Sequence, residues 1–268
     1  TRRLSSAASD VYKRQKPAFD FNFRTTQGLL QFEQEISNSD AWRWTAATGI
    51  SINRTSSFEG DYSIPLVLGG GPSGYLKSGN LKLSTNISHQ RERSSWNANL
   101  YFLQGLAGVT EESHRHNLNL QGTDIGEARA IGGLLDVSWL ITPKLVWTGR
   151  AAGQHAFAPL PSSMTFSLGS DVGLRGLPGS LVSGDSGWLA STELVWTAWE
   201  KDKQALQLVP FIGMGGVHTD VLDDSIGSGG LLARYVNGRW QFELGWVDTF
   251  NSDAVSYTHL RAHETSPH

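Results

Sequence analysis

Apolar and polar side chains alternate residue by residue in one segment of this chain after another. In one such segment Trp188, Leu194 and Trp196 share one phase, and Ser191 and Glu193 share the other. A period of two puts these sets on opposite faces of a strand, and tryptophan at both ends of the apolar face is typical of a strand that spans an outer membrane. The alternation predicts about eleven strands and no helix. The segments are 19–24, 30–36, 42–53, 81–88, 96–102, 135–139, 145–154, 188–198, 206–214, 226–236 and 240–246.

The connections between these segments alternate between short and long, with one medium link at 218–225 and one exception, a short link at 25–28. Outer-membrane barrels carry tight turns at one rim and long loops at the other, whereas a soluble β-sandwich has no reason to sort its loops in this way. We therefore predict an all-β, antiparallel transmembrane β-barrel. The short links are 37–41, 91–95, 142–144, 200–204 and 237–238, and the long ones are 54–79, 104–129 and 158–186.

Composition narrows the class of protein further. The chain has 268 residues, of which 39% are hydrophobic, and it contains no cysteine. No apolar run approaches the roughly 18 residues of a membrane helix, and thiol catalysis and disulfide frameworks are excluded. The net charge of −3 argues against nucleic acid as a partner.

Tryptophans recur on the apolar phase near strand ends, which predicts an aromatic girdle in contact with outer-membrane lipid. These are Trp42, Trp96, Trp188, Trp199, Trp240 and Trp246.

The segment before the strand at 188–198 is a glycine-rich loop with little charge and a single arginine, Arg175. Its run LGSDVGLRGLP at 168–178, followed by GDSGW at 184–188 and STEL at 191–194, resembles the transporters of bacterial two-partner secretion. These are the haemolysin secretion/activation proteins, a branch of the Omp85 superfamily. The arginine–glycine pair by itself is a weak signal, and the whole stretch is much more specific.

The resemblance implies that the long loop at 158–186, here named the lumen loop, folds back into the barrel. Family members carry a V-R-G-F/Y motif in this loop, and its arginine docks on the inner wall of the barrel. Leu174 stands where valine is usual in the motif, and Leu177 stands in place of the aromatic residue. The motif residues are Gly173, Leu174, Arg175, Gly176 and Leu177, and the loop-to-strand motif supplies Gly184, Asp185 and Gly187.

The family's partner for the loop arginine is an aspartate in an F-x-D-x-G motif on the next strand. Here that motif reads Phe211, Gly213 and Gly215, with glycine in the place of the aspartate. An arginine inside a barrel still needs acceptors, because an unpaired desolvated charge is costly. We expect Glu193, on the polar phase of the adjacent strand, to be the partner of Arg175, followed by Asp136 and Glu243. A solvated loop arginine is the alternative.

Two other motifs invite a catalytic or metal-binding interpretation. The sequence GDSG at 184–187 surrounds the nucleophile of chymotrypsin-like proteases, but Trp188 replaces the usual next glycine and the serine begins a strand with membrane-type alternation. His114 and His116 lie close to Glu111 and Glu112, as metal ligands could. We interpret them as a solvated polar loop. We therefore expect no catalytic site, no metal and no cofactor.

The resemblance also implies the function. Family barrels have roughly sixteen strands preceded by periplasmic POTRA domains, and they pass an unfolded exoprotein from the periplasm to the cell surface. We expect residues 16–253 to be part of such a barrel, located in the bacterial outer membrane as a monomer. Segments 1–15 and 254–268 resemble translated sequencing adapters and are expected to be non-native. The alternatives are an Omp85-type insertase, which folds other barrels, and a diffusive porin.

Overall fold

A computed structural model describes residues 21–59, 62–64, 67, 69–70, 74–177, 182–218, 223–238 and 240–250. The two end segments that we expect to be non-native, 1–15 and 254–268, lie outside these ranges, as do residues 178–181 of the lumen loop.

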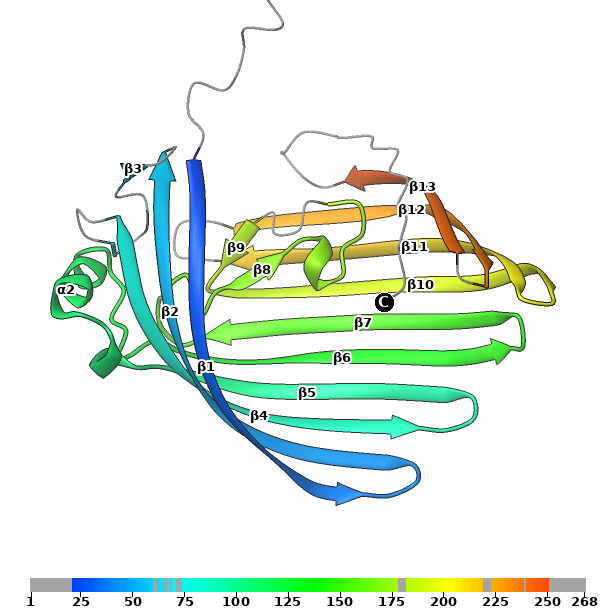
Figure 1. Cartoon of the computed structure of the whole chain (residues 1–268), viewed down its shortest axis with the longest axis horizontal. Helices are drawn as coiled ribbons and strands as arrows, with labels where there is room; N and C mark the ends of the chain where they lie inside the picture. Colours follow the sequence, from blue (N-terminus) through cyan, green and yellow to red (C-terminus); the bar gives the residue numbers. More distant parts are fainter. Residues whose placement is uncertain are drawn as a thin grey trace, which may run out of the picture.

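The described residues form one curved antiparallel sheet of 11 strands (Figure 1). Strands that follow one another in the chain are neighbours in the sheet, and the edges are β1 and β13, so the sheet is part of a barrel and is not closed. The two-residue strand β3 (Tyr62–Ser63) pairs with β2 off this path. The long strands are β1 (Phe21–Asn38), β2 (Trp42–Glu59), β4 (Tyr75–Gln90), β5 (Ser94–Gly105), β6 (Arg129–Thr142), β7 (Leu145–Ala156), β10 (Ser186–Lys201), β11 (Gln204–His218), β12 (Asp223–Asn237) and β13 (Trp240–Phe250).

The predicted sorting of connections by length is confirmed. Residues 39–41, 91–93, 143–144 and 202–203 make tight turns, whereas residues 106–128 and 157–185 make long excursions. Figure 1 shows most of the tight turns gathered at one end of the sheet and the helix of the 106–128 loop at the other. In the two-residue turn between β10 and β11, Asp202 has a φ of 54°, a left-handed conformation that aspartate tolerates better than most residues do.

The two faces of the sheet differ as the alternation predicts. Large apolar side chains on one phase, among them Trp42, Trp188, Trp199, Trp240 and Trp246, stand exposed. This is the face that an outer-membrane barrel turns toward lipid. The other phase carries polar residues, together with apolar residues where the lumen loop packs against it, and we call it the inner face. Buried polar residues on the inner face include Thr45, Ser51, Asn53, Asn80 and Gln154.

The first two predicted strands are in fact one. Residues 21–24 and segment 30–36 join through the predicted link at 25–28, whereas residues 19–20 of the first segment lie outside the described ranges. The ladder with β2 continues without a break past Gly28, which faces Ile52. The 17-residue span of β2 opposite offers backbone partners along the whole segment, so tertiary pairing overrides the local signal.

The prediction that the chain has no helix is wrong in the 106–128 loop. Helix α2 (Glu112–Leu120) buries His114 and Leu118, which lie four residues apart and so share one helix face. Leu118 packs with Val67 and Leu76, and the His114 ring meets the edge of Tyr75 at 4.9 Å between centroids. His114 is therefore not solvated. No helix in the described ranges is long and apolar enough to cross a membrane.

The remaining short elements lie in the loops. The 3-10 helix η1 (Ala107–Val109) precedes α2. Within the lumen loop, β8 (Phe166–Leu168) pairs with β9 (Val182–Gly184), and the 3-10 helix η2 (Ser170–Val172) lies between them in the chain. The main apolar cluster is formed where this loop meets the sheet. Its buried members are Phe166, Leu168, Leu174 and Leu177 of the loop and Leu189, Val217 and Ile226 of the inner face.

The lumen loop and its seat on the inner face

The lumen loop leaves β7, runs along the inner face and returns to β10. Figure 1 shows β8 and β9 lying over β10 and β11. The small ladder β8–β9 stiffens the loop, and its apolar side chains bury it against the wall. Burial of this apolar surface stabilises the loop on the wall. The polar contacts below decide its position.

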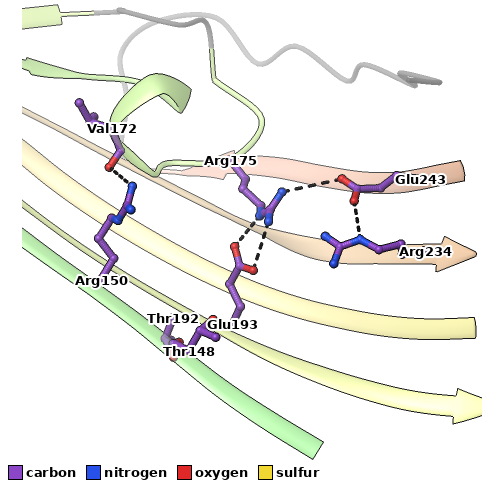
Figure 2. A network of polar contacts seen from close by, with 8 residues as sticks. All are labelled: Thr148, Arg150, Val172, Arg175, Thr192, Glu193, Arg234 and Glu243. Carbon is purple, nitrogen blue, oxygen red and sulfur yellow. Dashed lines mark hydrogen bonds and ion pairs between the residues drawn. The ribbon is translucent and has the colours of Figure 1, made fainter. Parts of the chain in front are cut away.

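Arg175 reaches the wall with its guanidinium fork (Figure 2). Its Nε donates to Oε1 of Glu193, and its Nη2 donates to Oε2 of the same carboxylate at 3.2 Å. A second carboxylate, Glu243 of β13, lies 3.8 Å from Nη1. Two parallel hydrogen bonds between arginine and a carboxylate fix direction as well as distance.

A second arginine completes the group. Arg234 of β12 donates to Glu243 at 2.9 Å, across the cross-strand pair that the two residues form. The network thus contains two arginines and two carboxylates, and its formal charges cancel.

Side-chain exposure is 36% for Arg175 and 23% for Glu193, so solvent screens the pair in part. The hydrogen bond to Glu193 raises the pKa of Arg175 above its ordinary value despite partial desolvation, and the loop arginine stays charged.

The three wall residues expected as partners of Arg175 divide into two sets. Glu193 and Glu243 both contact Arg175. Asp136 instead pairs with Arg150 of β7, at 2.6 Å from Nε and 3.2 Å from Nη2. Arg150 also donates from Nη1 to the backbone carbonyl of Val172 in the lumen loop, at 3.4 Å. The wall therefore also reaches toward the loop.

Two glycines of the loop motif are required by close packing. Gly173 has a φ of 122°, and a Cβ there would lie 2.8 Å from Cδ of Arg150. Gly176 has a φ of 81°, and a Cβ there would lie 2.3 Å from Cγ1 of Val247 in β13. Both positions therefore combine a backbone conformation that favours glycine with a neighbour in the space of a side chain. The motif lies flat on the wall from β7 to β13.

Gly213 occupies the place of the family aspartate, and the structure gives a packing reason for glycine there. A Cβ at this position would lie 2.9 Å from Cδ2 of Leu174 and 2.9 Å from Cβ of Ser191. Leu174, which is longer than the usual valine, fills the space above Gly213. Phe211 packs with Val209 and Leu232, and a Cβ on Gly215 would meet Leu168 of the loop at 2.8 Å.

Restoring the family residue by Gly213→Asp will therefore weaken the seat of the loop. The new side chain overlaps Leu174 and adds a carboxylate on the strand next to Glu193, and overpacking of this kind costs about 1–3 kcal/mol. We expect faster proteolysis of the lumen loop in the folded protein. The double variant Gly213→Asp, Leu174→Val makes room for the new side chain and should regain part of the protection. If Gly213→Asp protects the loop better than the native residue does, this packing explanation is wrong.

The loop-to-strand motif closes the base of the loop. The backbone N–H of Leu160 donates to Oδ1 of Asp185 at 3.1 Å, and that of Ala156 donates to Oγ of Ser186 at 3.0 Å. A Cβ on Gly184 would lie 2.9 Å from Cβ of Val217, and one on Gly187 would lie 2.4 Å from Phe166. The aspartate and serine that suggest a protease hold backbone groups here.

A cavity of about 810 Å³ lies beside the loop, toward the rim of tight turns. Arg150, Arg175 and Glu193 line it on the loop side, and Arg43 and Ser88 line it on the far side. In the part of the chain that the structure describes, no three histidine, aspartate or glutamate side chains gather as metal ligands would. Acidic and basic side chains balance in the lining of the cavity, and apolar side chains such as Trp42 and Trp96 contribute to it as well.

Arg150, Gln154 and Arg234 lie on the polar phase of their strands in the sequence, and that phase by itself assigns them no role. Arg234 could have been found from its cross-strand position opposite Glu243 once the register was known. Arg150 and Gln154 bind backbone carbonyls of the loop, and a backbone carbonyl leaves no signal in a sequence.

Residues 76–228, more than half of the chain, match the family described as haemolysin secretion/activation protein ShlB/FhaC/HecB. None of the curated proteins matches the chain in sequence. The matched region runs from β4 into β12 and includes the lumen loop, Arg150, Arg175 and Glu193.

Solved structures of similar fold include two proteins named CdiB. The CdiB from Escherichia coli aligns with a TM-score of 0.70 at 15% identity, over 91% of this chain and 44% of its own. The CdiB from Acinetobacter baumannii aligns with a TM-score of 0.65 at 15% identity, over 90% of this chain and 41% of its own. This chain thus spans less than half the length of either protein.

A third similar structure is BamA from Haemophilus ducreyi lacking POTRA domains 1–3, with a TM-score of 0.57 at 12% identity, over 90% of this chain and 53% of that one. At these identities the structural likeness establishes the fold, that of an outer-membrane β-barrel.

Proposed function

This chain belongs to the ShlB/FhaC/HecB family of haemolysin secretion/activation proteins, and from that premise we propose that the whole protein is the outer-membrane pore of a two-partner secretion system. Its substrate is an unfolded exoprotein, which it passes from the periplasm to the cell surface. Its outer face contacts outer-membrane lipid, and one copy of the barrel forms the pore. The protein is a transporter and not an enzyme, and it needs no cofactor.

The observation that carries this proposal is the seat of the lumen loop. A long loop lies on the inner face, its single arginine pairs with wall carboxylates on β10 and β13, and glycines let it lie flat. A loop fastened in this way shapes a pore. The inner face beyond the loop carries hydroxyl and amide side chains, which can exchange hydrogen bonds with an extended polypeptide of any sequence.

The proposal is tested with the intact gene and an exoprotein gene recovered from the neighbouring DNA. The two are expressed together in a bacterial host that lacks both, and the exoprotein in the medium is compared with the exoprotein in the periplasm. We expect release to the medium to require the transporter. A strain in which the barrel is folded in the outer membrane and the exoprotein stays periplasmic would contradict the proposal. Raised levels of other folded barrels in that strain would instead support an insertase.

A further inference from the structure

Gln154 holds both ends of the lumen loop with a single side chain. It lies on the inner face of β7 and is only 7% exposed. Its Nε2 donates to the carbonyl of Met164 at 2.9 Å and to the carbonyl of Asp185 at 2.9 Å. Met164 lies where the loop runs inward, and Asp185 lies where it returns to β10. The glutamine therefore joins two stretches of backbone that enter and leave the loop.

The carboxamide of Gln154 is also held from the other side. Its Oε1 accepts a hydrogen bond from the hydroxyl of Tyr101 in β5 at 3.0 Å. Tyr101, Gly132 and Gln154 occupy one cross-strand row on β5, β6 and β7. A Cβ on Gly132 would lie 2.4 Å from the Tyr101 hydroxyl oxygen, so glycine in the middle strand leaves the space through which tyrosine reaches glutamine.

The chemistry at this place requires an amide. Two carbonyl oxygens need two donors, and a hydroxyl that donates needs an acceptor. A glutamine supplies both N–H groups and the oxygen, and this fixes which way its carboxamide points. A carboxylate would set negative charge against two carbonyls, and an apolar side chain would leave both carbonyls without this donor in a buried site.

We call the two backbone stretches at Met164 and Asp185 the stem of the lumen loop, and residues 173–177 its tip. We propose that Gln154 is a positioning residue that keeps the stem closed, independently of the Arg175 network that holds the tip. With Gln154 in place, the stretches of backbone that enter and leave the loop stay side by side. Without it, the contacts of Asp185 and Ser186 remain, but the stem opens more often while Arg175 still holds the tip on Glu193. The claim that Gln154 closes the stem is independent of the proposed function. A role of this closure in secretion rests on the proposed function.

The test uses Met164 as a reporter, because its side chain is 2% exposed beside the stem. Met164→Cys is introduced into the intact transporter from which any other cysteine has been removed, and the rate of modification by a membrane-impermeant maleimide is measured in outer membranes. Gln154 binds the backbone carbonyl of residue 164, so the reporter leaves that hydrogen bond in place. Resistance of the barrel to unfolding in detergent shows that each variant has folded.

Gln154→Leu should raise the rate of modification about 10- to 30-fold, the factor that corresponds to the loss of two net hydrogen bonds. The matched control is Gln207→Leu. Gln207 is a glutamine on the inner phase of β11 whose side chain makes no hydrogen bond within the described ranges, and its replacement should leave the rate unchanged. Tyr101→Phe removes the hydrogen bond to Oε1 but neither donor to the loop, so the rise should be a few-fold.

Gln154→Glu separates positioning from a general packing effect. When ionised, its carboxylate repels both loop carbonyls and the stem opens. When protonated, it donates one hydrogen bond, so the rate, corrected for the intrinsic reactivity of a thiol, should fall as the pH is lowered. A rate that does not depend on pH in this variant would contradict the proposal, because loss of packing alone does not titrate.

An unchanged rate in folded Gln154→Leu overturns the proposal. Should that variant fail to fold, Tyr101→Phe decides, and an unchanged rate there overturns it as well. Labelling requires no exoprotein, so it is independent of the proposed function. If the stem opens in a protein that secretes nothing, the role of Gln154 stands and the proposed function is wrong. If all variants of a secreting protein are labelled at the native rate, the proposed function stands and the role of Gln154 is wrong.

Discussion

Replacing Arg175 with alanine in the intact transporter will lower release of the exoprotein by about tenfold or more while the barrel still assembles in the membrane. The change removes both hydrogen bonds to Glu193, and bonds to charged groups contribute about 1.5–3 kcal/mol each. Glu243 keeps Arg234, so Glu193 is the residue left without its partner. The barrel does not depend on this contact, because its ladders are formed strand to strand.

The measurement compares exoprotein in the medium with detergent-resistant barrel in the membrane. Arg91→Ala, in an exposed tight turn, is the matched loss of one arginine away from the loop and should secrete normally. Arg175→Lys keeps the charge but cannot make two parallel hydrogen bonds, so it should fall between the native protein and the alanine variant. Normal secretion by Arg175→Ala would remove this residue from the mechanism.

Gly176→Val is expected to unseat the tip of the loop more completely than any loss of a polar contact. A non-glycine residue at a φ of 81° costs about 1–2 kcal/mol. The added side chain also overlaps Val247, whose Cγ1 lies 2.3 Å from the new Cβ. We expect trypsin to cut after Arg175 in the folded barrel at least tenfold faster than in the native protein.

Gly122→Val is the matched control for this substitution. Gly122 has a φ of 83° and nothing within 4 Å of an added Cβ, so it carries the same backbone strain without the overlap. The control should leave cleavage after Arg175 unchanged. Adding Val247→Gly to Gly176→Val removes the overlap and keeps the strain, so protection should return in part. Equal cleavage in the Gly176 and Gly122 variants would show that the contact with Val247 does not hold the loop.

The sheet could be predicted from the sequence because a strand that faces lipid on one side and polar groups on the other must alternate. The same rule put Glu193 on the inner face, on the strand that follows the loop, and so made it the first choice of partner for Arg175. The role of Arg234 could not be predicted, because it depends on where the loop crosses β12 and β13, and no local sequence pattern encodes that path. Asp136, a later candidate than Glu193, pairs instead with Arg150 on the neighbouring strand β7.

Helix α2 was missed because its stabilising contacts are few and unusual. One of its two buried side chains is a histidine, and the apolar surface that receives Leu118 comes from Val67 and Leu76, far away in the sequence. Gly213 shows the opposite case. The sequence revealed the departure from the family motif, but only the structure shows that Leu174 fills the place and that Glu193 with Glu243 supplies the charge.

The attachments of the lumen loop tip also bear on the order in which the barrel assembles. Arg175 of the loop and Glu193 are separated by 18 residues, and the supporting pairs within the wall are closer still, Arg150 and Asp136 by 14 and Arg234 and Glu243 by 9. Contacts between residues so close in the chain lose little loop-closure entropy when they form. The stretch from β6 to β13 holds every partner of the tip, so this half of the sheet can close on its loop before β1–β5 are in place. The lumen loop is then already bound to the wall when strands β1–β5 are added opposite it.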